Sequence, residues 1–323
     1  MVDIDALRPF LKKTLESTDF KNLGHKYTGK VRDVYIQSTR KRRILIATDR
    51  QSAFDQLWCT IPFKGQVLTQ LSAWWFEQVA DVMPNHLLAT PDPNVMVVKE
   101  LKMLPIEIIV RGYLTGSTGT SAWVNYAQGK RNLCGNVLPE DMVKNQPFPS
   151  PIITPTTKGE HDESIDAKEI VERGLATAQQ WDEITEKAIA LFARGQEIAA
   201  ERNLILVDTK YEMGFDERDV LTLADEVHTP DSSRYWIADT YEGRFARGEE
   251  PESLDKEFFR LWLREQGFDP AKPERKPPIT DDVRLRLTLR YIDLFERMTG
   301  ETFLLPKKGD VMARIKRHLE PFS

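Results

Sequence analysis

The feature that most constrains the fold is a long helical pattern that runs directly into an apolar strand. Between Trp181 and Ala199, apolar residues recur at the spacing of one helix face. The segment LILVD, which begins at residue 204, is rich in apolar and β-branched residues. We therefore expect a helix followed at once by a strand.

Weaker patterns surround this pair. Two β-like runs between Tyr27 and Thr48 are separated by QSTRK and predict a hairpin. Glycine, proline, threonine and asparagine between Ser117 and Ile165 predict long loops, which often line sites in enzymes. The remaining predictions are helices over residues 4–16, 65–79 and 281–298, the last being the final helix, and strands over 95–98 and 106–110.

Strands that come first and helices that come later predict an α+β protein. A chain of 323 residues with 41% hydrophobic composition can bury the core of one large domain or of two lobes. We expect a β-rich N-terminal lobe over residues 1–112 and a larger mixed lobe over 113–323, with the break between Arg111 and Gly119.

The composition excludes several classes of protein. The formal net charge of -5 gives no electrostatic reason to expect nucleic acid or an anionic membrane as a partner. Cys59 and Cys134 are far apart and lack metal-ligand spacing, so neither a disulfide scaffold nor a zinc site is favoured. No apolar run approaches the ~20 residues that span a bilayer. We expect a cytoplasmic protein.

The run LILVDTKYEMGFDERDVLTLADE carries the most informative charges. Side chains alternate along a strand, so Asp208, Lys210 and Glu212 share one face. A turn centred on residues 216 and 217 would set Asp208 opposite Asp225. Gathered carboxylates suit Mg²⁺ shared with nucleotide phosphates. The alternative is a solvated hairpin face with ordinary ion pairs.

Cations are spread over several other segments. Gly29 and Lys30 precede Arg32 in GKVRDVY, where Lys30 and Arg32 would share a strand face and could cover phosphates. A single glycine is a weak signal, because no GxGxxG or GxxxxGK[ST] pattern is present. Lys64 precedes the helix at 65–79, and Lys99 follows the strand at 95–98.

Two hydroxyl-rich segments could hold a phosphate or a carboxylate. Arg111 is followed by a loop that includes Ser117 and offers hydroxyl and backbone N–H donors. Asp231, Ser232 and Arg234 form a second compact set, where arginine can contact a phosphate with two N–H groups. Capped turns would use the same residues. No histidine has a Ser-His-Asp order or HExxH spacing, which disfavours hydrolases and zinc enzymes.

Seven segments follow one another along the chain: GKVRDVY, ATDRQSAFD, PFKGQVLTQLS, VRGYLTGST, TPTTKGEHDE, LILVDTKYE and LADEVHTPDSSR. Taken together in this order, they resemble the segments of SAICAR synthetases. The resemblance extends from about residue 20 to the helix at 281–298 and is weakest over residues 241–280. It implies a two-lobed α+β SAICAR synthase-like fold with a nucleotide cleft similar to those of ATP-grasp proteins and kinases.

The resemblance also implies an activity and a set of site residues. The family joins L-aspartate to carboxyaminoimidazole ribotide (CAIR) and converts ATP to ADP and phosphate. The N-terminal lobe would bind the nucleotide, and the larger lobe would carry the metal and ribotide sites. The expected catalytic residues are Lys210, Asp208 and Lys30, and the expected magnesium ligands are Glu212 and Asp225. Nucleotide contacts are assigned to Gly29, Lys30, Arg32, Lys99, Met103 and Glu107. Substrate contacts are assigned to Lys64, Arg111, Ser117, Lys158, His161, Asp162, Asp231, Ser232 and Arg234.

This chemistry fits the charge inventory. A carboxylate is a poor electrophile, and its phosphorylation by ATP would give an acyl phosphate that an amine can attack without a protein nucleophile. The partners would be ATP, CAIR and L-aspartate, with the chain as a monomer or small homo-oligomer. Two rivals remain: a small-molecule kinase, which would phosphorylate its substrate without aspartate, and a non-catalytic nucleotide-binding protein, which would bind ATP without turnover.

Overall fold

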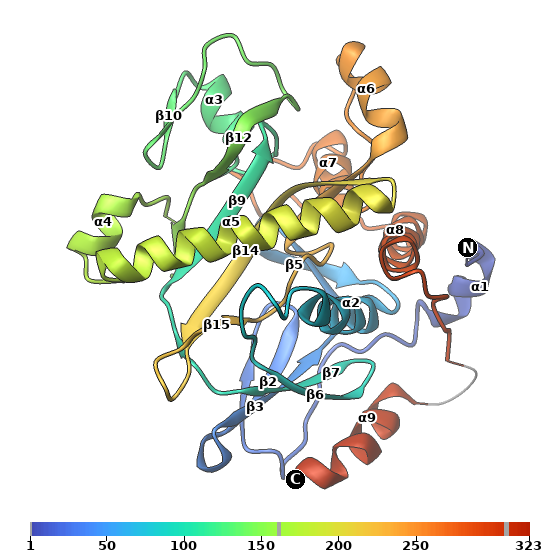
Figure 1. Cartoon of the computed structure of the whole chain (residues 1–323). Helices are drawn as coiled ribbons and strands as arrows, with labels where there is room; N and C mark the ends of the chain where they lie inside the picture. The colour runs from blue at the N-terminus through green and yellow to red at the C-terminus, as the bar shows by residue number, and fades with distance from the viewer. Residues whose placement is uncertain (1, 160–162, 307–309) are drawn as a thin grey trace. The chain divides into compact units, whose positions relative to one another are not determined.

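The computed structural model describes residues 2–159, 163–306 and 310–323, with elements in the order shown in Figure 1. The chain divides into two compact units. The first holds Met1–Glu77, His86–Glu100 and Phe258–Ser323, and the second holds Gln78–Asn85 and Leu101–Glu257. This division differs from the single boundary expected after residue 112, because residues near the C-terminus pack with the N-terminal strands.

The first unit is built on a five-stranded antiparallel sheet in the order β1-β2-β3-β7-β6. Its strands are β1 (His25–Thr28), β2 (Arg32–Gln37), β3 (Arg42–Ala47), β6 (Leu87–Asp92) and β7 (Val95–Lys99). The predicted hairpin between Tyr27 and Thr48 is confirmed as β2 and β3, which the 3₁₀ turn η2 (Ser38–Arg40) connects. The predicted strand at 95–98 is confirmed as β7.

Helices and one further hairpin complete this unit. They are α1 (Ile4–Leu7), η1 (Arg8–Phe10), β4 (Arg50–Ala53), β5 (Gln56–Thr60), α2 (Lys64–Gln78), α7 (Glu257–Glu265), α8 (Asp281–Thr299), α9 (Val311–Leu319) and η3 (Glu320–Phe322). The last residue of α2 and the first residue of α7, Gln78 and Glu257, belong to the second unit. The helices predicted at 65–79 and 281–298 are confirmed as α2 and α8. The prediction that the latter is the final helix is wrong, because α9 follows it.

The opening helix is shorter than the predicted span of residues 4–16. Pro9 lies just after α1, in η1, and proline has no backbone N–H to continue an α-helix. Farther on, Leu15 exchanges backbone and side-chain hydrogen bonds with Asp49, which holds this part of the chain outside a helix. Local apolar spacing alone could not reveal that tertiary contact.

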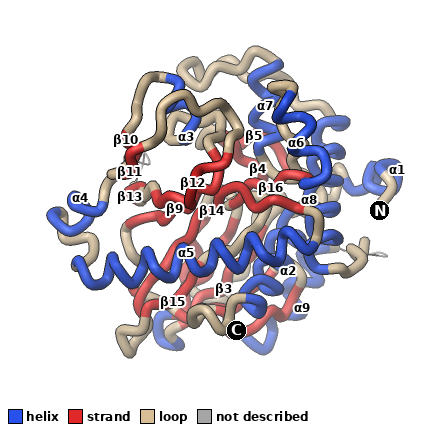
Figure 2. The backbone as a smooth tube through the Cα atoms, turned by 45° about the horizontal axis from the view of Figure 1, so that its top comes forward, coloured by secondary structure: helices blue, strands red, loops and turns tan. Residues whose placement is uncertain are grey.

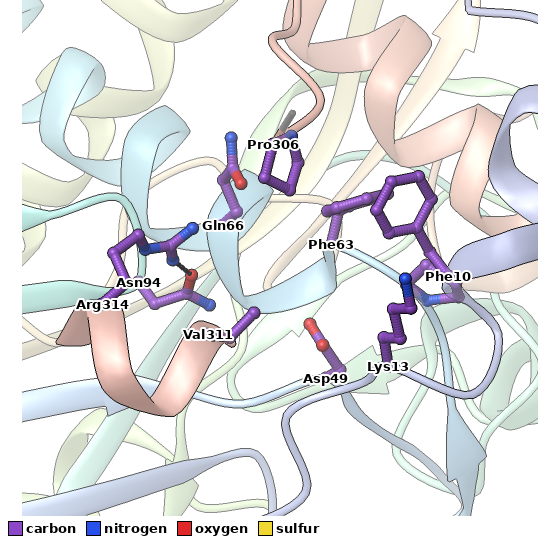
Figure 3. Close-up of a pocket in the computed structure, with 10 residues that line it drawn as sticks. Phe10, Lys13, Asp49, Phe63, Gln66, Asn94, Pro306, Val311 and Arg314 are labelled. Atoms are coloured by element: carbon purple, nitrogen blue, oxygen red, sulfur yellow. Dashed lines mark hydrogen bonds between the residues drawn. The ribbon is translucent and has the colours of Figure 1, made fainter. Parts of the chain in front are cut away.

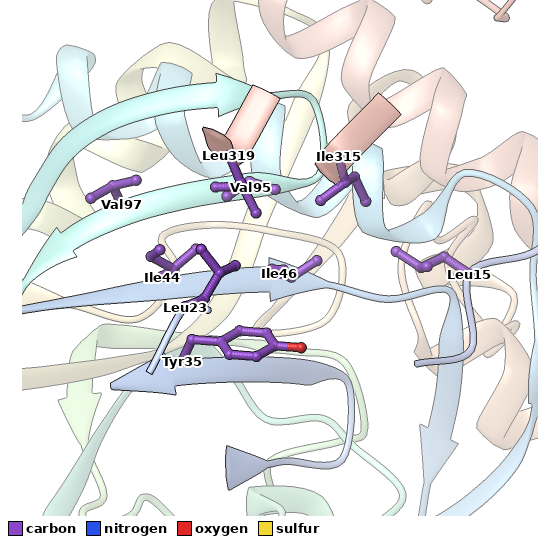
Figure 4. Packing of buried hydrophobic residues seen from close by; sticks show 9 residues of the cluster. All are labelled: Leu15, Leu23, Tyr35, Ile44, Ile46, Val95, Val97, Ile315 and Leu319. Carbon is purple, nitrogen blue, oxygen red and sulfur yellow. The ribbon is translucent and has the colours of Figure 1, made fainter. Parts of the chain in front are cut away.

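Figure 4 shows the core that joins α9 to the sheet of the first unit. Ile44 and Ile46 alternate on one face of β3, while Val95 and Val97 do so on β7. Ile315 and Leu319, one helical turn apart on α9, pack against the same cluster. Arg314 and His318 of α9 also form hydrogen bonds with the buried carboxylate of Asp92 in β6, so both apolar and ionic contacts hold α9 against the sheet.

The second unit contains a seven-stranded sheet with the central path β12-β9-β14-β15, to which β8, β13 and β16 add. Its strands are β8 (Lys102–Met103), β9 (Ile106–Tyr113), β12 (Pro147–Ile153), β13 (Thr156–Thr157), β14 (Leu204–Phe215), β15 (Leu221–Ala224) and β16 (Ser233–Ile237). The predicted strands at 106–110 and 204–208 are confirmed as β9 and β14. Because β14 is central, its side chains meet residues from several neighbouring strands.

The long helix α5 (Ala178–Glu201) crosses β9 and β14 in both views (Figures 1 and 2), and it confirms the helix predicted from Trp181. Thr177 caps its first turn in a capping box with Gln180. At Gly195 a Cβ atom would lie 2.4 Å from Cε1 of His228, so only glycine allows the helix to approach this closely.

The region predicted as long loops contains short elements: α3 (Ala122–Ala127), β10 (Asn132–Leu133), β11 (Asn136–Val137), β12 and β13. The helices α4 (Ala167–Glu172) and α6 (Ala238–Ala246) complete the unit. The α+β prediction is confirmed by this mixture of sheets and helices. None of the helices in the described part of the chain is long and apolar enough to cross a membrane.

Candidate active site

The pairing of β14 with its neighbours places two groups of charged side chains along one strand. Asp208 lies opposite Arg111 of β9 and Arg234 of β16, while Glu212 lies opposite Ala224 of β15. The predicted pairing of Asp208 with Asp225 is therefore wrong. The chain between β14 and β15 is a five-residue turn, Asp216 to Val220, in which Asp216 accepts two backbone N–H bonds. This longer turn shifts the register from the one assumed.

The first group is the lysine-carboxylate cluster, formed by Glu107, Lys158, Lys210, Glu212 and Asp225. Lys210 Nζ lies 2.7 Å from Glu107 Oε1 and 2.8 Å from Glu212 Oε1. Lys158 pairs with the other oxygen of Glu212. Asp225 follows β15 in the left-handed backbone region, with φ of 59°. The predicted shared face of Lys210 and Glu212 is thus a real contact.

Ion pairs within the protein offset most of the charge in this cluster. Burial on its own lowers the pKa of Lys210, but Glu212, Glu107 and Asp225 outweigh it and hold that pKa above its usual range. Burial on its own raises the pKa of Glu212, but Lys210 and Lys158 lower it to about 2. Glu212 is therefore ionised at neutral pH.

The second group is the arginine cluster, formed by Arg111, Asp208, Arg234 and Glu257, all of which are buried. Asp208 Oδ2 lies 2.5 Å from Arg234 Nη1 and 3.6 Å from Arg111 Nη1. Glu257 Oε2 accepts from Nε and Nη2 of Arg234 at 3.3 and 3.2 Å. Two guanidinium groups are therefore held by two carboxylates.

The two arginines differ electrostatically. Burial lowers the pKa of Arg111 from its ordinary value. Burial also opposes the charge of Arg234, but Asp208 and Glu257 outweigh it and raise its pKa. Arg111 is further fixed by Thr154 Oγ1 at 2.7 Å and by the carbonyl of Thr120 at 3.0 Å.

The loop after β9 lies against the arginine cluster. Gly116 has φ of 104°, and a Cβ atom there would lie 2.9 Å from Arg234 Nη2 and 2.5 Å from Cβ of Ser121. Thr115 donates its hydroxyl to Asn145 Oδ1 at 2.7 Å, and Ser117 is buried beside them. Glycine thus lets backbone and guanidinium approach each other, as a binding loop requires.

The TPDSSR segment forms a compact turn. Thr229 Oγ1 accepts from the backbone N–H groups of Asp231 and Ser232, each at 3.3 Å. Asp231 Oδ2 lies 3.6 Å from Lys256 Nζ. The sequence thus forms the capped turn considered above and also delivers Arg234 to its cluster.

Beside this turn, Asp255 accepts backbone N–H bonds from Tyr235 and Glu257, and burial raises its pKa to about 7. These two bonds fix the backbone from which the side chain of Glu257 reaches Arg234.

In the first unit, Gly29 and Lys30 lie in the turn between β1 and β2, where the N–H of Gly29 bonds the carbonyl of Arg32 at 2.8 Å. Lys30 is exposed and lies 2.5 Å from Asp55, whereas Arg32 is buried. The predicted shared strand face of Lys30 and Arg32 is therefore wrong, because the strand begins only at Arg32.

Arg50 fixes this turn by donating to the carbonyls of Gly29 and Lys30 and by pairing with buried Asp33 at 3.0 Å. The turn therefore rests on a buried ion pair that presents Lys30 outward.

Lys64 is fully buried at the start of α2, next to Asp49. Asp49 accepts the backbone N–H groups of Leu15 and Gly65 at 2.7 and 3.0 Å, and burial raises its pKa to about 6. Figure 3 shows Asp49 among the residues that line a cavity of about 150 Å³, together with Phe10 and Phe63. In this arrangement Asp49 caps the helix and Lys64 lies within the fold.

Other predicted site residues fall in different places. Lys99 ends β7 in the first unit, while Met103 lies in β8 of the second unit, opposite Gly214. Glu107 joins the lysine-carboxylate cluster. His161 and Asp162 lie outside the described residues.

Reasoning from sequence missed four charged residues of these sites, namely Asp33, Arg50, Asp55 and Glu257. The first three lie inside GKVRDVY and ATDRQSAFD, where charges between apolar strand residues were an available signal. Glu257 lies in the motif-poor region 241–280, where no sequence signal marks it.

Comparisons with known proteins place these features in a family. The family model described as SAICAR synthetase matches residues 25–274. A protein named putative phosphoribosylaminoimidazole-succinocarboxamide synthase 2, from Agrobacterium fabrum, is 50% identical over 96% of this chain and 98% of its own length. The phosphoribosylaminoimidazole-succinocarboxamide synthase of Legionella pneumophila strain Paris is 48% identical over 92% of this chain and 95% of its own.

Solved structures agree. The SAICAR synthase from Saccharomyces cerevisiae, complexed with SAICAR, is 32% identical, has a TM-score of 0.77 and covers 90% of this chain and 100% of its own. A type-2 SAICAR synthetase in complex with ADP is similar in fold, with 24% identity and a TM-score of 0.66 over 87% of this chain and 100% of its own.

Proposed function

Since this chain belongs to the SAICAR synthetase family, we propose that the two charged clusters on β14 divide the work of an ATP-dependent ligase. The reaction joins L-aspartate to CAIR and yields SAICAR, ADP and phosphate in purine biosynthesis. The lysine-carboxylate cluster would serve the nucleotide and its metal ion, and the arginine cluster would serve the ribotide. The observation that carries this division is the register of β14, which separates Asp208 from Glu212 along one strand.

Glu212 and Asp225 are the residues that would hold Mg²⁺. Among the residues that the structure describes, no group of three or more His, Cys, Asp or Glu side chains is arranged to hold a metal. Two carboxylates nevertheless suit Mg²⁺, which commonly takes one or two protein carboxylates and completes its coordination with substrate phosphates and water. When bound, the ion would neutralise charge on the transferring phosphoryl group. Lys210 would keep Glu212 ionised and oriented.

Arg111, Arg234 and Ser117 would bind the ribotide phosphate. Guanidinium groups suit phosphate because two N–H groups can contact two oxygens at once. Asp208 and Glu257 fix the direction of both arginines in advance, which reduces the cost of ordering them on binding. Ser232 and Asp231 would be further contacts of the ribotide, and Lys158, His161 and Asp162 are proposed as contacts of the anionic co-substrates.

For the nucleotide, Gly29 and Lys30 would contact phosphates, with Arg32, Lys99, Met103 and Glu107 as further contacts. Support comes from the exposed ammonium of Lys30, which a turn fixed by Arg50 presents to solvent. Lys64 is buried, so it would act on the bound substrate through its positive charge.

The proposed chemistry proceeds through an acyl phosphate. A carboxylate oxygen of CAIR attacks the γ-phosphorus, and the bond to the ADP oxygen breaks. The amine of aspartate then attacks the acyl carbon, loses a proton and displaces phosphate. Lys210 and Lys30 would offset the charge on the phosphoryl oxygens, and Asp208 would hold the arginines that position the ribotide. No protein nucleophile takes part.

A direct assay tests this function. The purified chain is supplied with Mg-ATP and CAIR, with and without L-aspartate, while ADP release and product mass are followed. We expect aspartate-dependent ADP release and a succinocarboxamide product. Release of ADP with a phosphorylated product in the absence of aspartate would indicate a small-molecule kinase instead, and ATP binding without turnover would indicate a binding protein.

The cellular setting is proposed on the same grounds. The partners would be small molecules rather than nucleic acid, consistent with the net charge of -5. A cytoplasmic monomer or small homo-oligomer would fit this role.

A further inference from the structure

Lys158 and Lys210 both neutralise Glu212, but they are held in different ways. Lys210 projects from the middle of β14, and its ammonium group contacts two carboxylates, Glu107 and Glu212. Lys158 follows the short strand β13, which pairs with β9 (Figure 2), and its ammonium group contacts Glu212. Its side chain is 42% exposed, against 28% for Lys210 and 9% for Glu212. Of the two lysines, Lys158 is therefore the one whose ammonium group can move away from Glu212.

The charges of the cluster favour such an exchange. Glu107, Glu212 and Asp225 bring three negative charges, while Lys158 and Lys210 bring two positive charges, so the cluster has a net charge of -1. When Lys158 moves away, the net charge becomes -2, which a divalent cation would balance. Lys158 and a divalent cation would also compete for one group, the carboxylate of Glu212.

We propose that Lys158 is a displaceable counter-ion, which neutralises Glu212 until a divalent cation binds there and then releases the lysine toward an anionic group of a co-substrate. This inference rests on the proposed metal role of Glu212. It links metal binding to substrate binding, because binding of the metal ion frees the ammonium group of Lys158 for the next substrate. The backbone of Lys158 stays anchored through its N–H bond to the carbonyl of Pro105 at 3.0 Å, so only the side chain has to move.

The direction in which a Lys158 variant changes Mn²⁺ affinity shows whether Lys158 competes with the cation for Glu212 or helps to bind it. A unit positive charge about 6 Å from a divalent cation, in water-like surroundings, changes the affinity of that cation about tenfold. We therefore expect Lys158→Met to bind Mn²⁺ about tenfold more tightly than the wild type, measured without nucleotide by electron paramagnetic resonance of free Mn²⁺. Lys158→Arg keeps the charge and should stay within about twofold of the wild type.

Two further variants serve as controls. Lys168→Met removes an 80% exposed lysine on α4 that pairs with Glu172, and it should leave Mn²⁺ affinity unchanged. Glu212→Gln should weaken Mn²⁺ binding strongly, which tests the metal assignment by itself. Unchanged or weaker binding by Lys158→Met, with Glu212→Gln still defective, would overturn the counter-ion role and leave the proposed function standing. Normal binding by Glu212→Gln would overturn both the counter-ion role of Lys158 and the metal role of Glu212.

A chemical readout tests the release step. Acetylation by an N-hydroxysuccinimide ester reports how available each ammonium group is, and mass spectrometry assigns it to single lysines. Saturating Mg²⁺ should increase the acetylation rate of Lys158 in the wild type, but not in Glu212→Gln. A rate for Lys158 that is the same with and without Mg²⁺ in the wild type would contradict displacement.

Discussion

Asp208 offers a demanding test of the arginine cluster, because its removal leaves two buried guanidinium groups without their shared carboxylate. Asp208 Oδ2 lies 2.5 and 3.6 Å from nitrogens of Arg234 and Arg111. At an effective dielectric constant of about 20, these attractions are roughly 5 to 7 kcal/mol each. Most of this lost attraction is offset, because the variant no longer has to desolvate a buried carboxylate and because asparagine keeps some of the hydrogen bonds. We expect Asp208→Asn to lower the free energy of unfolding by about 3 kcal/mol.

The assay is denaturant unfolding of the full chain with and without inorganic phosphate. A loss of 3 kcal/mol corresponds to a fall in Tm of roughly 6 to 12 °C for a unit of 150–250 residues. Phosphate should restore more stability to Asp208→Asn than to the wild type, because it supplies the charge that the arginines have lost. The matched control is Asp182→Asn on the exposed face of α5, which should stay within about 0.5 kcal/mol of the wild type.

Two results would refute this reasoning. A change below about 0.5 kcal/mol for Asp208→Asn would mean that the buried pairs contribute nothing measurable. A large loss of stability that phosphate does not reduce would mean that the arginines do not accept a phosphate group.

Glu257→Gln should raise the KM for the ribotide about tenfold and leave the KM for ATP unchanged, since Glu257 orients Arg234; equal changes in both constants would contradict this. Asp225→Asn should lower turnover at limiting Mg²⁺ by about tenfold, while the free energy of unfolding stays within about 1 kcal/mol of the wild type; normal turnover with a large loss of stability would count against a metal role. Burial lowers the pKa of His228 to about 3 from its ordinary 6.5, so the unfolded chain takes up a proton that the folded chain excludes. Its contribution to stability is present above pH 6.5 and falls by up to about 1.4 kcal/mol per pH unit toward pH 3. His228→Gln should flatten that decline in denaturation curves between pH 7 and 4, and an unchanged slope would show that burial does not control this group.

Periodicity along the chain predicted the main elements but not their partners. The spacing from Trp181 marks α5, and the apolar run at residue 204 marks β14, because each pattern depends on local burial. The position of α9 could not be predicted in this way, since it depends on Asp92 and on the core around Ile315, far away in sequence. The α+β class was therefore accessible, and the discontinuous division into units was not.

The site shows the same limit. Alternation along β14 correctly grouped Lys210 with Glu212. The register error at Asp208 came from the length of the turn after Phe215, which a side chain hydrogen bond of Asp216 helps to determine. Glu257 was out of reach because its function depends on contact with Arg234, 23 positions away, and not on any local motif.

In the proposed division of the site, the two clusters on β14 bind different substrates. Direct binding of the ribotide and of Mn-ADP to the variants Arg234→Ala and Glu212→Gln tests it most directly. We predict that Arg234→Ala loses ribotide binding and keeps Mn-ADP binding, and that Glu212→Gln does the reverse. Loss of both ligands in each variant, with the fold intact, or retention of ribotide binding by Arg234→Ala would contradict the account.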